Sequence, residues 1–163
     1  MAVKDKGNGK TWNVINHLLL NAPCTSTELG KIMDVNPTDS AQPEGPLAFG
    51  VYAGGRWWRA RARQVPNDPV GSLDCSIAQE QILSRIFGID DPRTDTDVDF
   101  VGGIRGAAEL QRRVDSGAWS MALHLFPTQV EQLIAVSDAG KLMPPKSTWF
   151  EPKLRSGLFV HSF

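Results

Sequence analysis

The residues best suited to chemistry lie in a proline-rich stretch near the end of the chain, from Met143 to Leu154. Its three prolines remove backbone donors and favour extended geometry, so neither a helix nor a strand fits. Lys146 and Lys153 supply positive charge, and Ser147 and Thr148 supply hydroxyl groups. Backbone amides in such a turn can form an anion-binding concavity. The stretch therefore predicts an anion-binding loop; the alternative is a loop anchored by its aromatic residues that holds the last strand in place.

A glycine-rich turn is a second candidate anion site. Gly102, Gly103 and Gly106 lie between an apolar run, expected to be a strand, and a periodic segment, expected to be a helix. Free amides at the start of a helix attract anions, and Arg105 would add a charged, two-pronged donor. The spacing matches neither a dinucleotide fingerprint nor a P-loop. The alternative is a tight strand-to-helix turn whose arginine pairs with a nearby aspartate.

Three carboxylates in an acidic stretch are candidate metal ligands: Asp90, Asp91 and Asp95. Mg²⁺ binds through a few carboxylates together with phosphate oxygens of a substrate. A cofactor here would therefore be Mg²⁺ arriving with a nucleotide or pyrophosphate. The alternative is that Arg93 pairs with these aspartates and the stretch holds no metal.

The bulk composition narrows the functional classes. The 163 residues include 17 basic and 18 acidic side chains, for a net charge of −1, so nothing draws the whole chain toward nucleic acids or acidic membranes. No apolar segment is long enough to span a membrane. Cys24 and Cys75 lack metal or redox spacing and are expected to be free thiols of a cytoplasmic protein. The scattered His17, His124 and His161 are expected to be buried, hydrogen-bonded structural residues.

One arginine-rich strand suggests a different function. Arg59, Arg61 and Arg63 alternate onto one face of an expected strand, beside Trp57 and Trp58. Arginines contact phosphates and aromatic rings stack on bases, so a small nucleic-acid binder is an alternative. The balanced net charge argues against it.

Periodicity and turn signals predict an α/β or α+β fold, in which helices pack on a mixed sheet. A small helical pair is expected first, around Val14 to Leu19 and from a capping box at Thr25 and Glu28. A β-hairpin at 49–62, turned by a Gly-Gly pair, follows a proline-containing loop. We expect residues 1–46 to be a lead-in with short helices and a linker, and residues 47–163 to be the main domain.

The second half is expected to run strand, helix, strand, helix, loop, strand. The expected ranges, in chain order, are a helix from Ser72 or Asp74 to Phe87, a strand at 98–101, a helix ending at Gly117 on which Glu109 and Arg113 pair, a strand at 119–126, a helix from a capping box at Thr128 and Glu131 to Gly140, and a strand at 158–163.

Several longer motifs carry a resemblance to one family. They are Gly88-Ile89-Asp90-Asp91-Pro92-Arg93-Thr94-Asp95, Asp99-Phe100-Val101-Gly102-Gly103-Ile104-Arg105-Gly106, Arg113-Val114-Asp115-Ser116-Gly117, Pro127-Thr128 with Glu131-Gln132-Leu133, Ala139-Gly140, and the stretch from Met143 to Leu154. Together they resemble the C-terminal end of the family catalogued as domain of unknown function 1015. The likeness is strongest from Leu73 onward and weaker in the hairpin.

The resemblance implies a function as well as a fold. Family members typically carry an N-terminal half with a Gly-His-His-Arg element, which resembles the nucleotide-binding motif of ParB-like proteins and free serine kinases; this chain has no His-His pair. The resemblance therefore implies the C-terminal portion of a small-molecule phosphotransferase, with serine as the leading substrate. A small anionic metabolite is the expected ligand, and the missing half or a second copy is the expected protein partner. The alternative is a non-catalytic structural or substrate-covering domain.

Overall fold

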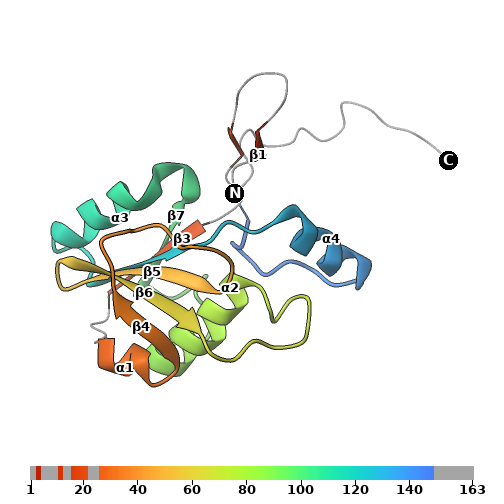
Figure 1. The fold of residues 1–163 in the computed structure, drawn as a ribbon, viewed down its shortest axis with the longest axis horizontal. Helices are drawn as coiled ribbons and strands as arrows, with labels where there is room; N and C mark the ends of the chain where they lie inside the picture. Colours follow the sequence, from red (N-terminus) through yellow and green to blue (C-terminus); the bar gives the residue numbers. More distant parts are fainter. Residues whose placement is uncertain (1–2, 5–10, 13–15, 22–25, 149–163) are drawn as a thin grey trace.

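The computed structural model describes residues 3–4, 11–12, 16–21 and 26–148, and it has an α+β fold built on one six-stranded sheet (Figure 1). The strand order is β4-β6-β5-β8-β3-β7, and each strand pairs antiparallel with its neighbours. The sheet is thus antiparallel and not mixed. Its strands are β3 (Asn16–Leu20), β4 (Met33–Pro37), β5 (Ala48–Ala53), β6 (Arg56–Ala62), β7 (Val98–Gly102) and β8 (Met121–Leu125), and β1 (Val3–Lys4) and β2 (Thr11–Trp12) form a separate pair.

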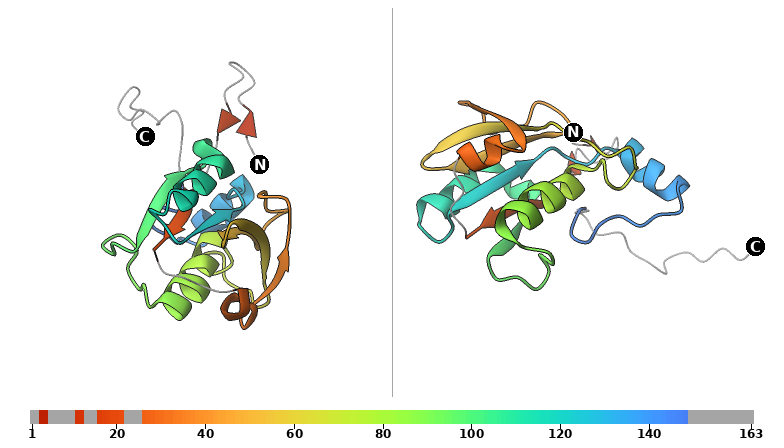
Figure 2. Two further views of the ribbon diagram at one scale, coloured as in Figure 1. Left: turned by 90° about the vertical axis from the view of Figure 1, so that its left-hand side faces the viewer. Right: turned by 90° about the horizontal axis from the view of Figure 1, so that it is seen from below.

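Helices cover both faces of the sheet (Figure 2). The helical segments are α1 (Ser26–Gly30), α2 (Asp74–Ile77), η1 (Ala78–Phe87), η2 (Gly103–Arg105), α3 (Gly106–Asp115) and α4 (Val130–Asp138). One face packs with α1, α2 and η1 into the larger hydrophobic cluster, which includes Leu29, Ile82 and Leu123. The other face packs with α3 into a smaller cluster, which includes Leu110 and Ala122. Because a hydrophobic cluster lies on each face, the middle strands β5, β8 and β3 are buried on both sides.

The first predicted helix is wrong, because residues 16–20 form strand β3. Leu18 and Leu20 pack into the larger cluster, and Leu19 packs into the smaller one. A strand buried on both faces is a continuous apolar run, and a short apolar run fits a helix equally well. Both β3 and β4 come from the first 46 residues, and both belong to the six-stranded sheet.

Most other elements are confirmed close to their expected positions. Strands β5 and β6 form the hairpin, and Gly54 and Gly55 at its turn have φ of 61° and 75°, the left-handed geometry that two-residue hairpin turns require. The predicted pair of Glu109 and Arg113 forms on α3, with Oε1 and Nε 2.7 Å apart. Residues 158–163, expected to be the last strand, lie outside the described residues.

Two helix starts differ from their predictions. Leu73, and not Ser72 or Asp74, is the N-cap residue of α2. The buried carboxylate of Asp74 instead accepts a hydrogen bond from the amide of Leu47, which is shared between its two oxygens at 3.0 and 3.1 Å. The capping box of α4 is formed by Gln129 and Gln132, one residue later than expected. In both places a local capping signal was present, but tertiary contacts or a neighbouring side chain decided which residue is used.

No helix among the described residues combines the length and the apolarity that a membrane crossing needs.

Candidate functional site

A cavity of about 440 Å³ lies against the face of the sheet that η1 covers. Two loops border it: the acidic loop after η1, residues 90–93, and the proline-rich loop after α4, residues 144–147. Its walls are mostly apolar, and its lining residues are Leu18, Cys75, Gln79, Leu83, Asp90, Asp91, Pro92, Arg93, Phe100, Leu125, Pro144, Pro145, Lys146 and Ser147. The fold thus brings two stretches, each singled out by the sequence, to one cavity.

A tight turn places Lys146 at this cavity. The amide of Ser147 donates to the carbonyl of Pro144 at 3.3 Å, which closes a four-residue turn with Pro145 at its second position. Lys146 is at the third position with φ of 59°, as a type II turn requires, and glycine is the residue that usually adopts this geometry. A lysine held there is strained by roughly 1–2 kcal/mol. Its Nζ lies 5.6 Å from the centroid of the Phe100 ring on β7.

The other predicted residues of the proline-rich loop have different roles. Ser147 is buried, and its hydroxyl donates to the Pro144 carbonyl at 2.6 Å. Both donors of Ser147 are therefore used within the turn. Thr148 is half-buried and does not line the cavity. Lys153 lies outside the described residues.

Arg93 supplies a second positive charge at the cavity. Its Nε and Nη2 donate to the two carboxylate oxygens of Asp91, at 2.8 and 2.7 Å. The hydrogen bonds from Arg93 hold the pKa of Asp91 down, to about 2. This two-pronged pair fixes the plane of the guanidinium group while more than half of the Arg93 side chain stays exposed, at 58%.

The three candidate metal ligands do not gather. Asp91 pairs with Arg93, Asp90 accepts the hydroxyl of Ser84 at 2.5 Å, and Asp95 accepts the amide of Asp97 at 2.8 Å. Within the described ranges, no group of three or more His, Cys, Asp or Glu side chains is placed to hold a metal ion. Asp90 and Asp91 line the cavity, whereas Asp95 does not.

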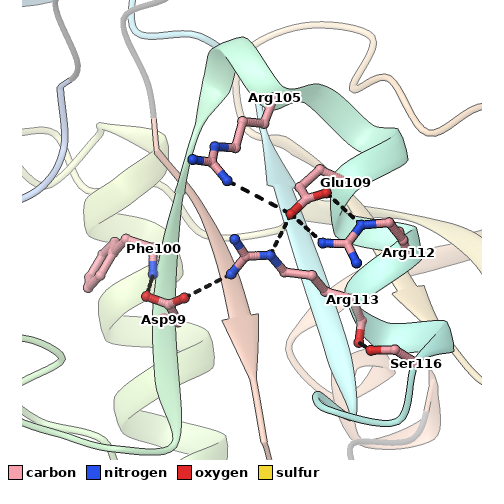
Figure 3. A network of polar contacts seen from close by, with 7 residues as sticks. All are labelled: Asp99, Phe100, Arg105, Glu109, Arg112, Arg113 and Ser116. Atoms are coloured by element: carbon pink, nitrogen blue, oxygen red, sulfur yellow. Dashed lines mark hydrogen bonds and ion pairs between the residues drawn. The ribbon is translucent and has the colours of Figure 1, made fainter.

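The glycine-rich turn leads into a cluster of charged residues that lies on the opposite side of β7 from the Phe100 ring (Figure 3). Glu109 accepts hydrogen bonds from Arg112 and Arg113, at 2.8 and 2.7 Å, and Arg105 lies 4.0 Å away. Hydrogen bonds from Arg112 and then Arg113 lower the pKa of Glu109 to about 2. Arg113 also bonds Asp99, at 3.1 Å. Arg105 thus joins an ion-pair cluster around a glutamate, and its side chain is 61% exposed.

The two candidate anion-binding turns do not meet. Phe100, beneath Lys146, packs against the larger cluster, and Val101 beside it belongs to the smaller cluster on the α3 face. Figure 3 shows the Phe100 ring pointing away from Arg105. None of Gly102, Gly103, Arg105 or Gly106 lines the cavity. The turn continues into α3, and α3 packs in the smaller cluster, so the turn belongs to the other face of the sheet.

Sequence reasoning missed several lining residues. Phe100 and Leu83 come from separate elements, so only the tertiary fold brings them together. Cys75, from α2, also lines the cavity, and burial raises the pKa of its thiol to about 11. The alternation of β7 was the one available signal, because it sets Phe100 opposite to Asp99 and Val101.

The remaining candidates in the described part of the chain do not line this cavity. His17 and His124 are buried, and His124 Nδ1 lies 2.7 Å from the carbonyl oxygen of Ala41. Of the three arginines considered for nucleic acid, Arg59 pairs with Glu44, and Arg63 pairs with Asp34. His161 lies outside the described residues.

Comparisons with known proteins show what the fold resembles. The sequence matches no family model, and it has no significant match among the curated proteins. The structure resembles a conserved hypothetical protein from Pyrococcus furiosus, with a TM-score of 0.53, 12% identity, and coverage of 90% of this chain and 57% of that one. It also resembles a mutant free serine kinase in complex with AMP, with a TM-score of 0.50, 11% identity, and coverage of 85% and 54%. The chain spans about half the length of both proteins and shares their fold over that half.

Proposed function

We propose that the cavity between the acidic and proline-rich loops binds a small metabolite that carries a phosphate or carboxylate group. The observation that carries this proposal is the strained turn that holds Lys146 at an otherwise largely apolar cavity. Backbone strain of this kind persists where the surrounding structure imposes it, and it clusters at ligand-binding sites. The volume of about 440 Å³ suits a metabolite or a nucleotide portion.

The chemistry of the lining supports an amphipathic anion. Leu83 and Phe100 offer apolar contact for the body of a ligand, and Lys146 offers a cation for its charged end. Arg93, whose charge is paired with Asp91, offers its remaining N–H donors. Asp91 holds Arg93 by two hydrogen bonds, so its guanidinium is already oriented before binding. A preoriented donor loses less freedom on binding than a mobile one.

We further propose that the chain is a portion of a small-molecule phosphotransferase of the family catalogued as domain of unknown function 1015. The motifs from residue 88 onward and the fold shared with a free serine kinase support this assignment. Serine is the leading phosphoryl acceptor. In such a reaction this domain would position and neutralise the anionic substrate, because phosphoryl transfer depends mainly on positioning and charge stabilisation. The remaining catalytic groups would come from the other half of the protein.

Mg²⁺ fits this cavity only together with a ligand. Two carboxylates, Asp90 and Asp91, line the cavity. Asp90 already accepts a hydrogen bond from Ser84, and Asp91 already accepts hydrogen bonds from Arg93. Mg²⁺ usually takes one or two carboxylates and completes its octahedron with phosphate oxygens and water. The described residues therefore do not make a metal site alone, and no step here depends on a metal.

The direct test is calorimetric titration with AMP and with pyrophosphate. Saturable binding is expected, and Lys146→Gln should weaken it about tenfold or more, because a hydrogen bond to a charged group contributes roughly 1.5–3 kcal/mol. Lys141→Gln is the matched control, since Lys141 pairs with Asp68 and does not line the cavity. Equal weakening in both variants, or no binding of either probe, would refute the proposal.

Thermal unfolding gives an independent readout. At a ligand concentration 100 times the Kd, binding adds about 2.7 kcal/mol to the free energy of unfolding, which raises Tm by about 5–10 °C in a chain of this size. The same shift should persist in Lys141→Gln and fall in Lys146→Gln. An increase in Tm that is unaffected by Lys146→Gln would place the ligand elsewhere.

A further inference from the structure

A second cavity, of about 400 Å³, lies on the opposite side of η1 from the first. Gln79 and Leu83 of η1 line the first cavity, whereas Gln81 and Arg85 line the second. The segment after α1 and the end of β6 complete the second cavity. Its lining residues are Lys31, Ile32, Arg63, Gln64, Gln81 and Arg85.

The lining of this second cavity is strongly cationic. Lys31, Arg63 and Arg85 come from three different elements, and none of the described lining residues is acidic. Arg63 has a counter-ion, because its Nε donates to Asp34 at 2.8 Å. Within the described part of the chain, the Lys31 and Arg85 side chains form no ion pair. Two uncompensated cations therefore border a hollow surface, which favours an anion there.

Hydrogen bonds fix the framework that holds these cations. Arg63 Nη1 donates to the carbonyl of Lys31 at 3.4 Å, which ties the end of β6 to the segment after α1. Gln81 Nε2 donates to the carbonyl of Gln64 at 2.8 Å, which ties the same strand end to η1. The three segments are thus cross-linked at the cavity by the side chains of Arg63 and Gln81.

We propose that this second cavity binds a small, multiply charged phosphate compound through Lys31, Arg63 and Arg85. A ligand with several negative charges is favoured because three cations converge and, among the residues that the structure describes, only Arg63 has a carboxylate partner. Arginine matches the geometry of a phosphate with two parallel hydrogen bonds, and lysine adds a point charge. The proposal is independent of the function assigned to the first cavity, since the two cavities have no described lining residue in common.

The test uses tripolyphosphate as the probe and the full chain, titrated by calorimetry at low salt. The double variant Lys31→Gln and Arg85→Gln should weaken binding about tenfold or more. The control Arg61→Gln removes an exposed arginine of β6 that does not line the cavity, so it should leave the affinity within about twofold. Lys146→Gln reports on the first cavity and should leave a separate binding event intact.

Three outcomes would overturn the proposal. Tripolyphosphate binding that survives in the double variant but is lost in Lys146→Gln would assign all binding to the first cavity. Equal weakening by Arg61→Gln would indicate a diffuse basic surface, of the kind that binds nucleic acids, and not a defined cavity. The absence of any binding at low salt would exclude the site, provided that thermal unfolding shows the protein to be folded.

Discussion

Acidification should destabilise the protein through a buried pair of histidines. His17 on β3 and His124 on β8 lie edge to face with their ring centroids 4.3 Å apart, and their side chains are 2% and 4% exposed. His17 Nδ1 accepts the amide of Leu125 at 3.3 Å, which requires that nitrogen to be unprotonated. Burial, and then the charge of His124, lower the pKa of His17 from 6.5 to about 3. Burial also lowers the pKa of His124.

The sign and size of the effect follow from this shift. Above pH 6.5, His17 is neutral in both the folded and the unfolded states, so its contribution to stability is complete. As the pH falls, the unfolded chain takes up a proton that the folded chain refuses until about pH 3. This difference in proton uptake lowers the free energy of unfolding by about 1.4 kcal/mol per pH unit below pH 6.5. Between pH 7 and pH 5 the loss for this one residue is about 2 kcal/mol. His124 acts in the same direction.

Urea unfolding of the wild type and of His17→Gln at pH 7 and pH 5 measures the effect. Glutamine keeps a polar side chain but cannot titrate, so the variant should lose about 2 kcal/mol less than the wild type over this interval. The carboxylates are common to both proteins, and their contributions cancel in the comparison. Equal pH dependence in the two proteins would refute the reasoning, as would an NMR titration that gives His17 a pKa near 6.5 in the folded state.

Three further predictions concern strain, packing and a buried charge. Lys146→Gly should be up to about 1 kcal/mol more stable than Lys146→Gln in urea unfolding, because glycine adopts the positive φ without strain. The gain is limited because glycine also adds conformational freedom to the unfolded chain. The reverse order of stability would contradict the positive φ at this position. Gly50→Ala should cost about 1–3 kcal/mol, since its Cβ would lie 2.4 Å from the carbonyl oxygen of Ala41. The control Gly30→Ala should cost less, since its Cβ would meet no described residue within 4 Å, and similar losses in the two variants would count against this packing. Burial raises the pKa of Asp74 from 3.8 to about 6, so its contribution is complete below pH 3.8 and is lost as the pH rises through 6. Asp74→Asn should therefore gain about 2.5 kcal/mol on the wild type between pH 4 and pH 8, and a difference that does not grow with pH would exclude this cause.

Local signals predicted most of the fold. The Gly54-Gly55 turn determines the hairpin without help from distant residues, because positive φ at both positions is a property of the turn itself. The helix that contains Glu109 was predicted from its apolar stripe and from the ion pair one turn along it. Strand β3 was missed because Val14, Ile15, Leu18 and Leu19 recur at helical spacing, and the three consecutive leucines of the strand are too short a run to distinguish a buried strand from a helix.

The candidate site was predicted only in part, because contacts between distant segments decide it. The unusual composition of the proline-rich loop was enough to single out Lys146, which the structure places at the cavity. Its convergence with Arg93 depends on how the tertiary fold brings the loop after η1 and the loop after α4 to one cavity, which no local pattern encodes. Arg105 was grouped with Lys146 because both are cations in turns with available amides, yet Arg105 leads into α3, which packs on the other face of the sheet.

The central claim is that an anionic metabolite occupies the cavity beside Lys146. NMR mapping of backbone amides during a titration with AMP tests this claim most directly. We predict saturable shifts that concentrate at Arg93, Phe100 and Lys146. Shifts confined to the turn at Arg105, or spread evenly over the charged surface, would contradict the claim.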